Sequence, residues 1–322
     1  MPFRVALLDD YQDVALPLTA FGDDVEAVAF ADHVADPARL VARLRGFDAV
    51  VCMRERTPIT AGILDGLPDL RLVVTTGMRN ASIDLAAAAA RGVTVCGTGG
   101  AGGRASTTEH TWALLLALAR NLPAQDAAVR AGGWQLGLGT VLAGSTLGLL
   151  GLGNLGAAMV PVARALGMHV TAWSPNLTSE RAAEIGVEAP DRETFFRTAD
   201  VLSVHLVLSP RSVGTIGAGE FSLMKPTALL VNTSRGPIVD EAALVMALHS
   251  GRIAGAALDV FDTEPLPADH PLRTAPRTVL APHTGYVARQ SYAEYFADVT
   301  DDVAAFRAGR PVRVLTSPEG TP

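Results

Sequence analysis

Three side chains that together can bind an anionic substrate and move a proton stand near the C-terminal end of this sequence, each after a short apolar run. They are Arg235 in NTSRG, Glu264 in DVFDTEP and His283 in APHTGY. An arginine can bind a carboxylate through two parallel hydrogen bonds, and a histidine can exchange a proton near neutral pH. A carboxylate beside the imidazole stabilises the protonated ring and fixes its tautomer. The three residues therefore predict a site that binds an anionic substrate and moves a proton, with Arg235 on the substrate and Glu264 and His283 as an acid–base pair.

A glycine-rich turn upstream predicts a dinucleotide site. GLGNLG, residues 151–156, follows the apolar run TLGLL and opens a segment with the pattern of a helix that reaches about Leu166. In this context the glycines permit a tight turn and let a pyrophosphate approach the backbone. The N-terminus of the following helix stabilises the charge of the pyrophosphate.

The adenosine end of the predicted site is less selective. An NAD site usually has an acidic residue at the end of the next strand, where it binds the ribose 2′-hydroxyl. Here the run HVTAW is followed by Ser174, Pro175 and Asn176, and the nearest arginine is Arg181. No carboxylate repels a 2′-phosphate and no adjacent arginine attracts one. We therefore expect NAD or NADP to bind with weak discrimination.

The ends of four consecutive predicted strands carry polar groups, and in an open parallel sheet such ends share one edge, where ligands bind. The strand ends place His205, Asn232 to Arg235, Asp259 and His283 at this edge, and Asp259 can accept a hydrogen bond from the nicotinamide carboxamide. The residues predicted to bind the cofactor are Gly151, Gly153, Asn154, Leu155, Gly156, Ser174, Asn176, His205, Thr233 and Asp259.

Strands and helices alternate along the chain, which predicts parallel sheets in an α/β fold. The predicted strands are Val5–Leu8, Val25–Phe30, Ala49–Cys52, Leu70–Thr75, Val93–Cys96, Thr146–Leu150, His169–Trp173, Val201–His205, Ala228–Val231, Ala254–Leu258 and Thr278–Leu280. The clearest predicted helices are Pro37–Arg45, Leu85–Ala90, Thr107–Asn121, Glu241–Ser250 and Arg289–Arg307.

Two domains are expected for 322 residues. The glycine stretch GTGGAGG, residues 97–103, precedes a long helix and is a plausible boundary. The last helix has an apolar face but no sheet of its own, so we expect it to return to the first domain. The prediction is a substrate-binding domain of residues 1–100 and 288–322 and a dinucleotide-binding domain of residues 101–287.

The composition excludes several classes of function. Hydrophobic residues make up 49% of the chain and charged residues 18%, which is typical of a globular protein. The net charge of −7 argues against nucleic acid or an anionic membrane as a partner. The N-terminus lacks the pattern of a signal peptide, and the apolar stretch Trp112–Ala119 is too short to span a bilayer. Cys52 and Cys96 show no metal-ligand spacing and suit a reducing cytoplasm, and we expect no metal site.

Several of these segments together resemble the D-isomer-specific 2-hydroxyacid dehydrogenase family. The matching segments are TTEHTWALLLALARN, GLGNLG, MKPTALLVNTSRGPIVDEAAL, AALDVFDTEPLP and APHTGY, which cover most of residues 100–290. The resemblance implies a Rossmann cofactor domain and a flavodoxin-like substrate domain, the latter built from both chain termini. It implies Arg235 as the substrate-binding arginine, His283 as the acid/base and Glu264 as its partner. It also implies Asp259 near the nicotinamide, NAD or NADP as cofactor, a small 2-keto or 2-hydroxy acid as substrate, and a homodimer.

The first hundred residues resemble the family more weakly. Arg54, in CMRERTPIT, falls where some members hold an anionic group. The segment TTGMRNASID occupies the place of the family's substrate-carboxylate loop, which usually carries small residues, but this chain has Met78, Arg79 and Asn80 there. We expect Arg54, Met78, Arg79 and Asn80 to contact substrate together with Arg235. Arg54 and Arg79 would suit a second anion such as a phosphate, a phosphonate or a distal carboxylate, and the alternative is that both are ordinary surface arginines.

Two other functions remain open from the sequence. Phosphite-type anion oxidation would keep the same Arg, Glu and His, whereas Glu264 argues against a formate-oxidising enzyme, which has an amide at that place. A dinucleotide-sensing scaffold of the corepressor type shares the fold and needs no catalysis. The leading prediction is an NAD(P)-dependent reductase of a small 2-keto acid that works in the cytoplasm.

Overall fold

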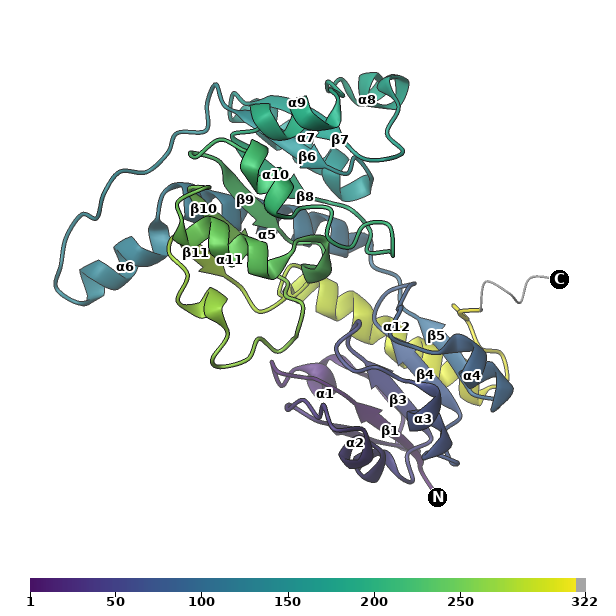
Figure 1. Ribbon diagram of the computed structural model, residues 1–322. Coiled ribbons are helices and arrows are strands. Elements are labelled where there is room, and N and C mark those ends of the chain that lie inside the picture. The colour runs from purple at the N-terminus through teal and green to yellow at the C-terminus, as the bar shows by residue number, and fades with distance from the viewer. Residues whose placement is uncertain (317–322) are drawn as a thin grey trace. The chain divides into compact units, whose positions relative to one another are not determined.

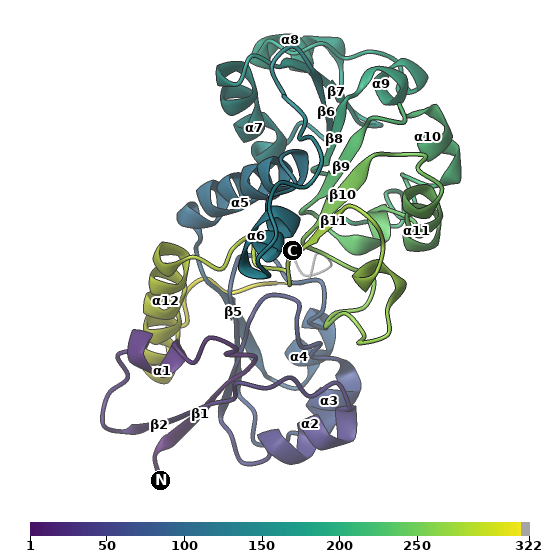
Figure 2. The same cartoon turned by 90° about the vertical axis from the view of Figure 1, so that its left-hand side faces the viewer.

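The chain folds into two compact units. The computed structural model describes residues 1–316, apart from the side chains of residues 101 and 102. One unit comprises Met1–Gly102 and the chain from Ala288 onward, and the other comprises Gly103–Val287. The last six residues of the predicted segment 288–322 lie outside the described residues. Each unit is built on its own parallel sheet (Figures 1 and 2).

The first unit contains a five-stranded sheet in the order β2-β1-β3-β4-β5, with every neighbouring pair parallel. Its strands are β1 (Phe3–Leu7), β2 (Val25–Ala29), β3 (Ala49–Cys52), β4 (Leu72–Thr75) and β5 (Thr94–Gly97). The strand order reverses between β1 and β3, which makes the carboxyl end of this pair the usual ligand edge of such a sheet.

Helices cover both faces of this sheet. They are α1 (Ala15–Leu18), α2 (Pro37–Leu44), α3 (Ala61–Asp65), α4 (Leu85–Ala90) and α12 (Arg289–Arg307). Figure 2 shows α1 and α12 on one face and α2, α3 and α4 on the other. Asp36 caps α2 by accepting a hydrogen bond from the backbone N–H of Arg39. The last helix packs on this unit, where Tyr292 of α12 donates a hydrogen bond to Gln12.

The second unit contains a six-stranded parallel sheet in the order β11-β10-β9-β8-β6-β7. Its strands are β6 (Thr146–Leu150), β7 (His169–Trp173), β8 (Val201–Val204), β9 (Leu229–Asn232), β10 (Gly255–Leu258) and β11 (Thr278–Leu280). The order reverses between β6 and β8. Two parallel-sheet α/β units confirm the predicted fold class, and each predicted strand is present with its ends shifted by at most two residues.

The helices of this unit also lie on both faces of its sheet (Figure 2). They are α5 (Ala101–Ala119), α6 (Leu122–Arg130), α7 (Asn154–Ala165), α8 (Ser179–Ile185), α9 (Arg192–Thr198), α10 (Ala218–Leu223) and α11 (Glu241–His249), with 3-10 turns η1 (Gly236–Ile238) and η2 (Pro271–Arg273). Buried side chains of α5 and α7 fill one side of the sheet, and those of α9, α10 and α11 fill the other.

The long helix α5 corrects one prediction. It begins at Ala101 rather than at Thr107, so Gly102 and Gly103 are helical. Glycine is a weak helix former, but the hydroxyl of Thr107 donates to the carbonyl of Gly103 and ties the first turns together. Only the part of the predicted glycine hinge before Ala101 is non-helical. Within residues 1–316, we find no helix that combines the length and the apolar character needed to cross a membrane.

Candidate active site

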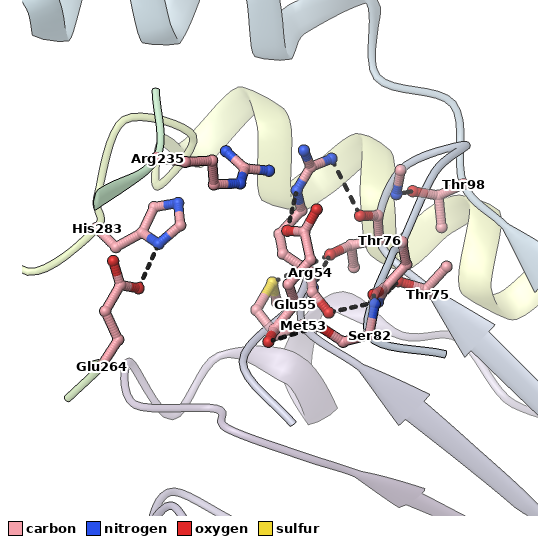
Figure 3. Close-up of polar contacts among 12 residues, drawn as sticks. Met53, Arg54, Glu55, Thr75, Thr76, Ser82, Thr98, Arg235, Glu264 and His283 are labelled. Atoms are coloured by element: carbon pink, nitrogen blue, oxygen red, sulfur yellow. Dashed lines mark hydrogen bonds and ion pairs between the residues drawn. The ribbon is translucent and has the colours of Figure 1, made fainter. Parts of the chain in front are cut away.

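His283 and Glu264 form the centre of the candidate site, as the residue types predicted. Nδ1 of His283 lies 2.6 Å from Oε2 of Glu264, and Figure 3 draws this contact as a dashed line. The other oxygen, Oε1, accepts a hydrogen bond of 2.9 Å from the backbone N–H of Phe261. The ring of Tyr286 packs edge-on against the imidazole, with ring centroids 5.6 Å apart. With Nδ1 facing the carboxylate, Nε2 is the ring atom left to exchange a proton with a ligand.

Asp259 braces the turn that carries His283. Its Oδ1 accepts from the backbone N–H of Thr284 at 2.7 Å, and its Oδ2 accepts from the N–H of Gly285 at 2.9 Å. The carboxylate is only 1% exposed, and Nε2 of His110 lies 3.1 Å from Oδ1. His283 itself has a φ of +53°, in the left-handed region, where a non-glycine residue needs such support. Sequence reasoning placed Asp259 at the nicotinamide, which stays a prediction, and the structure shows that Asp259 holds the turn of His283.

Arg235 follows β9 in a loop that its neighbours hold in place. The amide of Asn232 donates to the carbonyl of Arg235 at 3.0 Å, and its Oδ1 accepts from the N–H of Ser234 at 3.0 Å. Nη1 of Arg235 contacts the carbonyl of Ser234 at 2.7 Å. Thr233, buried beside this loop, shares a hydrogen bond of 2.8 Å with Thr111 of α5. The backbone and the guanidinium of Arg235 are therefore held by contacts with residues of the same unit.

The glycine turn is shaped to receive an anion. Gly151 has a φ of +105°, and a side chain there would meet the carbonyl oxygen of His205 at 2.7 Å. A side chain at Gly156 would meet the carbonyl oxygen of Gly151 at 2.1 Å. Helix α7 begins with Asn154 and Leu155, directly after Gly153. No side chain caps its N-terminus. Its first N–H groups thus suit the pyrophosphate of a dinucleotide, so the residues present fit NAD.

His205 directly follows β8, and the glycine turn directly follows the neighbouring strand β6, so the two lie at the point where the strand order reverses. Its Nε2 is 2.8 Å from the hydroxyl of Ser203, and burial lowers the pKa of the ring to about 4. The ring is therefore neutral at physiological pH, and it can serve the cofactor through shape and hydrogen bonding but not through charge.

The end of β7 is polar but uncharged. Ser174 is half-buried and Asn176 is exposed, and the backbone carbonyl of Ser174 closes a turn with the N–H of Leu177. Thr178 caps α8, and Arg181 pairs with Glu184 at 2.7 Å on the surface. The contact of Ser174 and Asn176 with a ribose therefore stays a prediction.

In the first unit, Arg54 stands at the carboxyl end of β3 with a φ of +53°. Its backbone N–H donates to the hydroxyl of Thr76, and its Nη1 donates to the carbonyl of Thr76 at 3.2 Å, as Figure 3 shows. Gly77 makes room for this contact, since a side chain there would meet Nη1 of Arg54 at 2.1 Å. The arginine is thus held over its neighbouring loop by specific contacts.

The three residues predicted from the unusual loop behave differently. Met78 is 48% exposed and Arg79 is exposed. Asn80 is 8% exposed, and its amide donates to the carbonyl of Arg54 at 2.6 Å and to the hydroxyl of Thr75 at 2.8 Å. Asn80 therefore supports the loop of Arg54, whereas Met78 and Arg79 are open to solvent in their unit.

Comparison with known proteins decides the family. The model of the D-isomer specific 2-hydroxyacid dehydrogenase NAD-binding domain matches residues 112–285, more than half of the chain. This protein belongs to the D-isomer-specific 2-hydroxyacid dehydrogenase family. The resemblance seen in the sequence is confirmed, and the matched residues include the glycine turn and the three loops that carry Arg235, Glu264 and His283.

Individual relatives agree. The chain is 38% identical over 280 residues to the glyoxylate reductase of Aeropyrum pernix, covering 84% of this chain and 83% of that protein. It is 36% identical over 276 residues to the D-3-phosphoglycerate dehydrogenase of Archaeoglobus fulgidus, covering 85% of this chain but 52% of that protein. The chain thus spans little more than half the length of the first phosphoglycerate dehydrogenases it matches. The crystal structure of a phosphoglycerate oxidoreductase from Vibrio cholerae superposes with a TM-score of 0.90 at 37% identity, covering 95% of this chain and 99% of that one.

Sequence reasoning missed several side chains of the candidate site. His110 and Thr111 of α5 reach Asp259 and Thr233, and Tyr286 packs on His283. In the sequence, only their position in TTEHTW and APHTGY, two segments that resemble the family, could have pointed to these residues. No spacing rule links a helix to loops more than a hundred residues later. In the described part of the chain, we find no group of three or more His, Cys, Asp or Glu side chains that could hold a metal ion.

Proposed function

We propose that this protein is an NAD(P)-dependent D-2-hydroxyacid dehydrogenase that reduces a small 2-keto acid. The observation that carries the proposal is the 2.6 Å contact between His283 and Glu264 in the unit that also presents Arg235 and the glycine turn. A carboxylate-paired imidazole together with an arginine is what reduction of a 2-keto acid requires of the protein. The bound nicotinamide supplies the hydride.

The side chains divide the remaining work. Arg235 binds the substrate carboxylate through its planar guanidinium and polarises the adjacent carbonyl. His283 donates the proton at Nε2 to the carbonyl oxygen as it becomes a hydroxyl. Glu264 stabilises the protonated ring before transfer and keeps Nδ1 oriented. In the reverse direction, His283 takes the proton from the hydroxyl group. Asp259 keeps His283 in its turn and remains our candidate for the carboxamide of the nicotinamide.

We propose that the unit containing β1–β5 binds substrate and that Arg54 and Arg79 serve a second anionic group on it. Arg54 is held by Thr76 and Arg79 is exposed, so the two differ in preorganisation. A phosphate or a distal carboxylate suits the paired donors of a guanidinium. A phosphorylated three-carbon acid, as the names of the phosphoglycerate dehydrogenases suggest, is therefore a substrate to test beside glyoxylate.

We propose that NAD and NADP bind with weak discrimination. Ser174 and Asn176 neither repel nor specifically attract a 2′-phosphate, and Arg181 is already paired with Glu184. The family model itself describes an NAD-binding domain. NAD is thus the first cofactor to test and NADP the second.

We propose a homodimer that works in a reducing cytoplasm. Segment 122–142 carries apolar side chains exposed to solvent, and Figure 1 shows α6 and the chain after it running out from the body of their unit. The exposed residues are Leu122, Val129, Trp134, Leu136, Leu138 and Val141. Exposed apolar surface of this kind is typical of a protein interface, and a second copy is the partner we propose. Cys52 and Cys96 are free, buried thiols, which suits the compartment.

The test is a panel of 2-keto acids assayed with NADH and with NADPH. The panel includes glyoxylate, hydroxypyruvate and its 3-phosphate, with phosphite and NAD as a separate assay. We expect saturable oxidation of the reduced cofactor with at least one keto acid, and loss of that activity in His283→Asn. Turnover of phosphite alone, or cofactor binding with no turnover of any acid, would contradict the proposal. Light scattering of the wild type and of Leu138→Asp tests the dimer, which the variant should weaken.

A further inference from the structure

Glu264 stands in a segment that has no helix or strand to hold it. Residues 261–270 lie between β10 and η2, and none of them is assigned to either kind of element. The side chain of Glu264 is 30% exposed, and its 2.6 Å contact with His283 requires a defined position. Contacts from outside the segment must therefore limit its freedom, because an exposed loop otherwise samples many conformations.

Glu241, the first residue of α11, contacts both ends of this segment with one carboxylate. Its Oε1 accepts a hydrogen bond of 2.9 Å from the backbone N–H of Asp262, and its Oε2 lies 3.2 Å from Nε2 of His270. The side chain is 15% exposed. Asp240 caps the same helix by accepting from the N–H of Ala243 and so fixes the point from which Glu241 extends.

The ring of His270 is oriented for this contact. Its Nδ1 accepts a hydrogen bond from the backbone N–H of Leu272 at 3.3 Å. A neutral imidazole that accepts at Nδ1 carries its proton on Nε2, which is the atom that faces Glu241. His270 therefore joins η2 to α11, and the side chain is only 19% exposed.

The loop of Arg235 and the segment of Glu264 also lie against each other through their backbones. A side chain at Gly236, directly after Arg235, would meet the carbonyl carbon of Phe261 at 2.1 Å, so only glycine fits. The N–H of Phe261 is the group that holds Oε1 of Glu264. A shift at Asp262 thus reaches both the Glu264 carboxylate and the loop of Arg235.

We infer that Glu241 and His270 are positioning residues that clamp the segment of Glu264 and thereby set how strongly Glu264 stabilises protonated His283. The inference rests on the proposed function of the His283–Glu264 pair. Neither residue needs to touch the substrate, because both act through the ends of the segment. Asp240 and Asp262 are charged groups beside the clamp, and Arg273 donates hydrogen bonds to the carbonyls of Leu266 and Pro267 in the same segment. Partial burial and the carboxylates of Glu241 and Asp240 raise the pKa of Asp262, which His270 opposes.

The variants follow from the geometry. Glu241→Ala removes both contacts, whereas Glu241→Gln keeps an acceptor for the N–H of Asp262. His270→Asn can still accept from Leu272 but is too short to reach Glu241, so it separates the clamp from the cap of η2. Glu193→Ala is the matched control, because Glu193 is an exposed first-turn glutamate that pairs with Arg197 at 2.8 Å in the same unit.

The decisive measurement is the titration of the His283 ring by NMR in protein labelled at histidine. The His283 signal is identified by its absence in His283→Asn, and the method needs no turnover. Glu264→Gln provides the reference, and we expect the midpoint of the His283 signal to fall in it because the carboxylate is lost. Glu241→Ala and His270→Asn should lower the midpoint in the same direction but by less than Glu264→Gln does. Glu241→Gln should lie between Glu241→Ala and wild type, and Glu193→Ala should match wild type.

The outcomes separate the clamp from the proposed function. A normal midpoint in Glu241→Ala and His270→Asn, with a lowered one in Glu264→Gln, would overturn the clamp and leave the catalytic pair intact. A normal midpoint in Glu264→Gln would overturn the pair on which the proposed function depends. Kinetics give a second check. The clamp variants should lower kcat severalfold and move the upper limit of the pH profile for reduction to lower pH, with KM for the cofactor unchanged. Lower thermal stability with an unchanged pH profile would show a merely structural role and contradict the inference.

Discussion

The carboxyl edges of the two sheets are built in different ways. In the second unit, loops from different strands bond to one another: Glu264 to His283, and Asp259 to Thr284 and Gly285. In the first unit, Arg54 and Asn80 tie neighbouring loops together, but Met78 and Arg79 project into solvent. The edge proposed for chemistry is thus cross-braced, and the edge proposed for substrate choice keeps open positions. Proton transfer needs atoms fixed to a fraction of an ångström, whereas selectivity can change through side chains that hold nothing else in place.

The most severe test of this contrast is His283→Asn. We expect kcat for keto-acid reduction to fall by about 10²–10⁴, the usual share of general acid–base catalysis. Asparagine keeps a polar side chain in the braced turn but cannot transfer the proton. Steady-state kinetics with saturating cofactor measure the effect. A variant with near-normal kcat would remove His283 from the mechanism.

Arg235→Lys tests whether the braced edge also needs planar geometry. Lysine keeps the charge but loses the two-pronged donor. We expect kcat/KM for the keto acid to fall by about 10–100-fold, or roughly 1.4–2.7 kcal/mol. Cofactor affinity should change little. If cofactor binding alone suffered, Arg235 would have to be reassigned to the cofactor.

Ser174→Asp sharpens the contrast within the second unit, because the end of β7 lacks the charges found at the ends of β10 and β11. We expect wild type to discriminate between NADH and NADPH by less than about tenfold in kcat/KM, or roughly 1.4 kcal/mol. The new carboxylate should shift preference towards NADH, mainly through lost NADPH binding. The ratio of the two kcat/KM values in each protein decides the matter. A wild type selective by several hundredfold would show that another residue controls the cofactor.

Arg54→Ala and Arg79→Ala probe the open edge. If they serve a second anion, each should lower kcat/KM for a dianionic keto acid, by about tenfold for the held Arg54 and less for the exposed Arg79. The kcat/KM for glyoxylate should change much less. Parallel assays with glyoxylate and 3-phosphohydroxypyruvate provide the comparison. Equal losses on both substrates would mean that neither arginine selects a second anion.

Substitution of Asp302 in α12 should have the smallest effect of these changes, and it should alter only the stability of the folded protein. Its carboxyl is fully buried, and burial raises its pKa to about 7, against the pull of Arg313. The folded state therefore binds this proton more tightly than the unfolded chain does. The stability linked to it is complete below the ordinary value of 3.8 and is lost as the pH rises through about 7. The asparagine of Asp302→Asn does not ionise, so only the wild type loses stability as the pH rises. The melting temperature of the variant minus that of wild type should therefore be about 2–4 °C higher at pH 8 than at pH 5. An unchanged difference between the two pH values would show that Asp302 is ionised throughout.

Local sequence patterns predicted the strands and the last helix, α12, because a run of neighbouring residues is enough to show the pattern of each. The alternation of short apolar runs with helical segments located the strands, and in the structure Asp36 and Asp240 cap the starts of α2 and α11. The start of α5 was missed because glycines that usually interrupt a helix here lie within one. Helices such as α6 were not predicted individually, and α6 has no buried residue to give it a clear apolar face.

The sequence by itself determined the α/β class, the family and the residue types of the candidate site, since strand ends in a parallel sheet share one edge. Only the tertiary structure decided which atoms meet there. Glu241 contacts Asp262 and His270 in the segment of Glu264, and Asp259 holds the turn of His283, through contacts between residues 21 to 29 positions apart. Such contacts have no periodicity, because they depend on where each loop leaves its strand and on the space that glycines such as Gly236 leave open. They exist only once the strands have been assembled into a sheet.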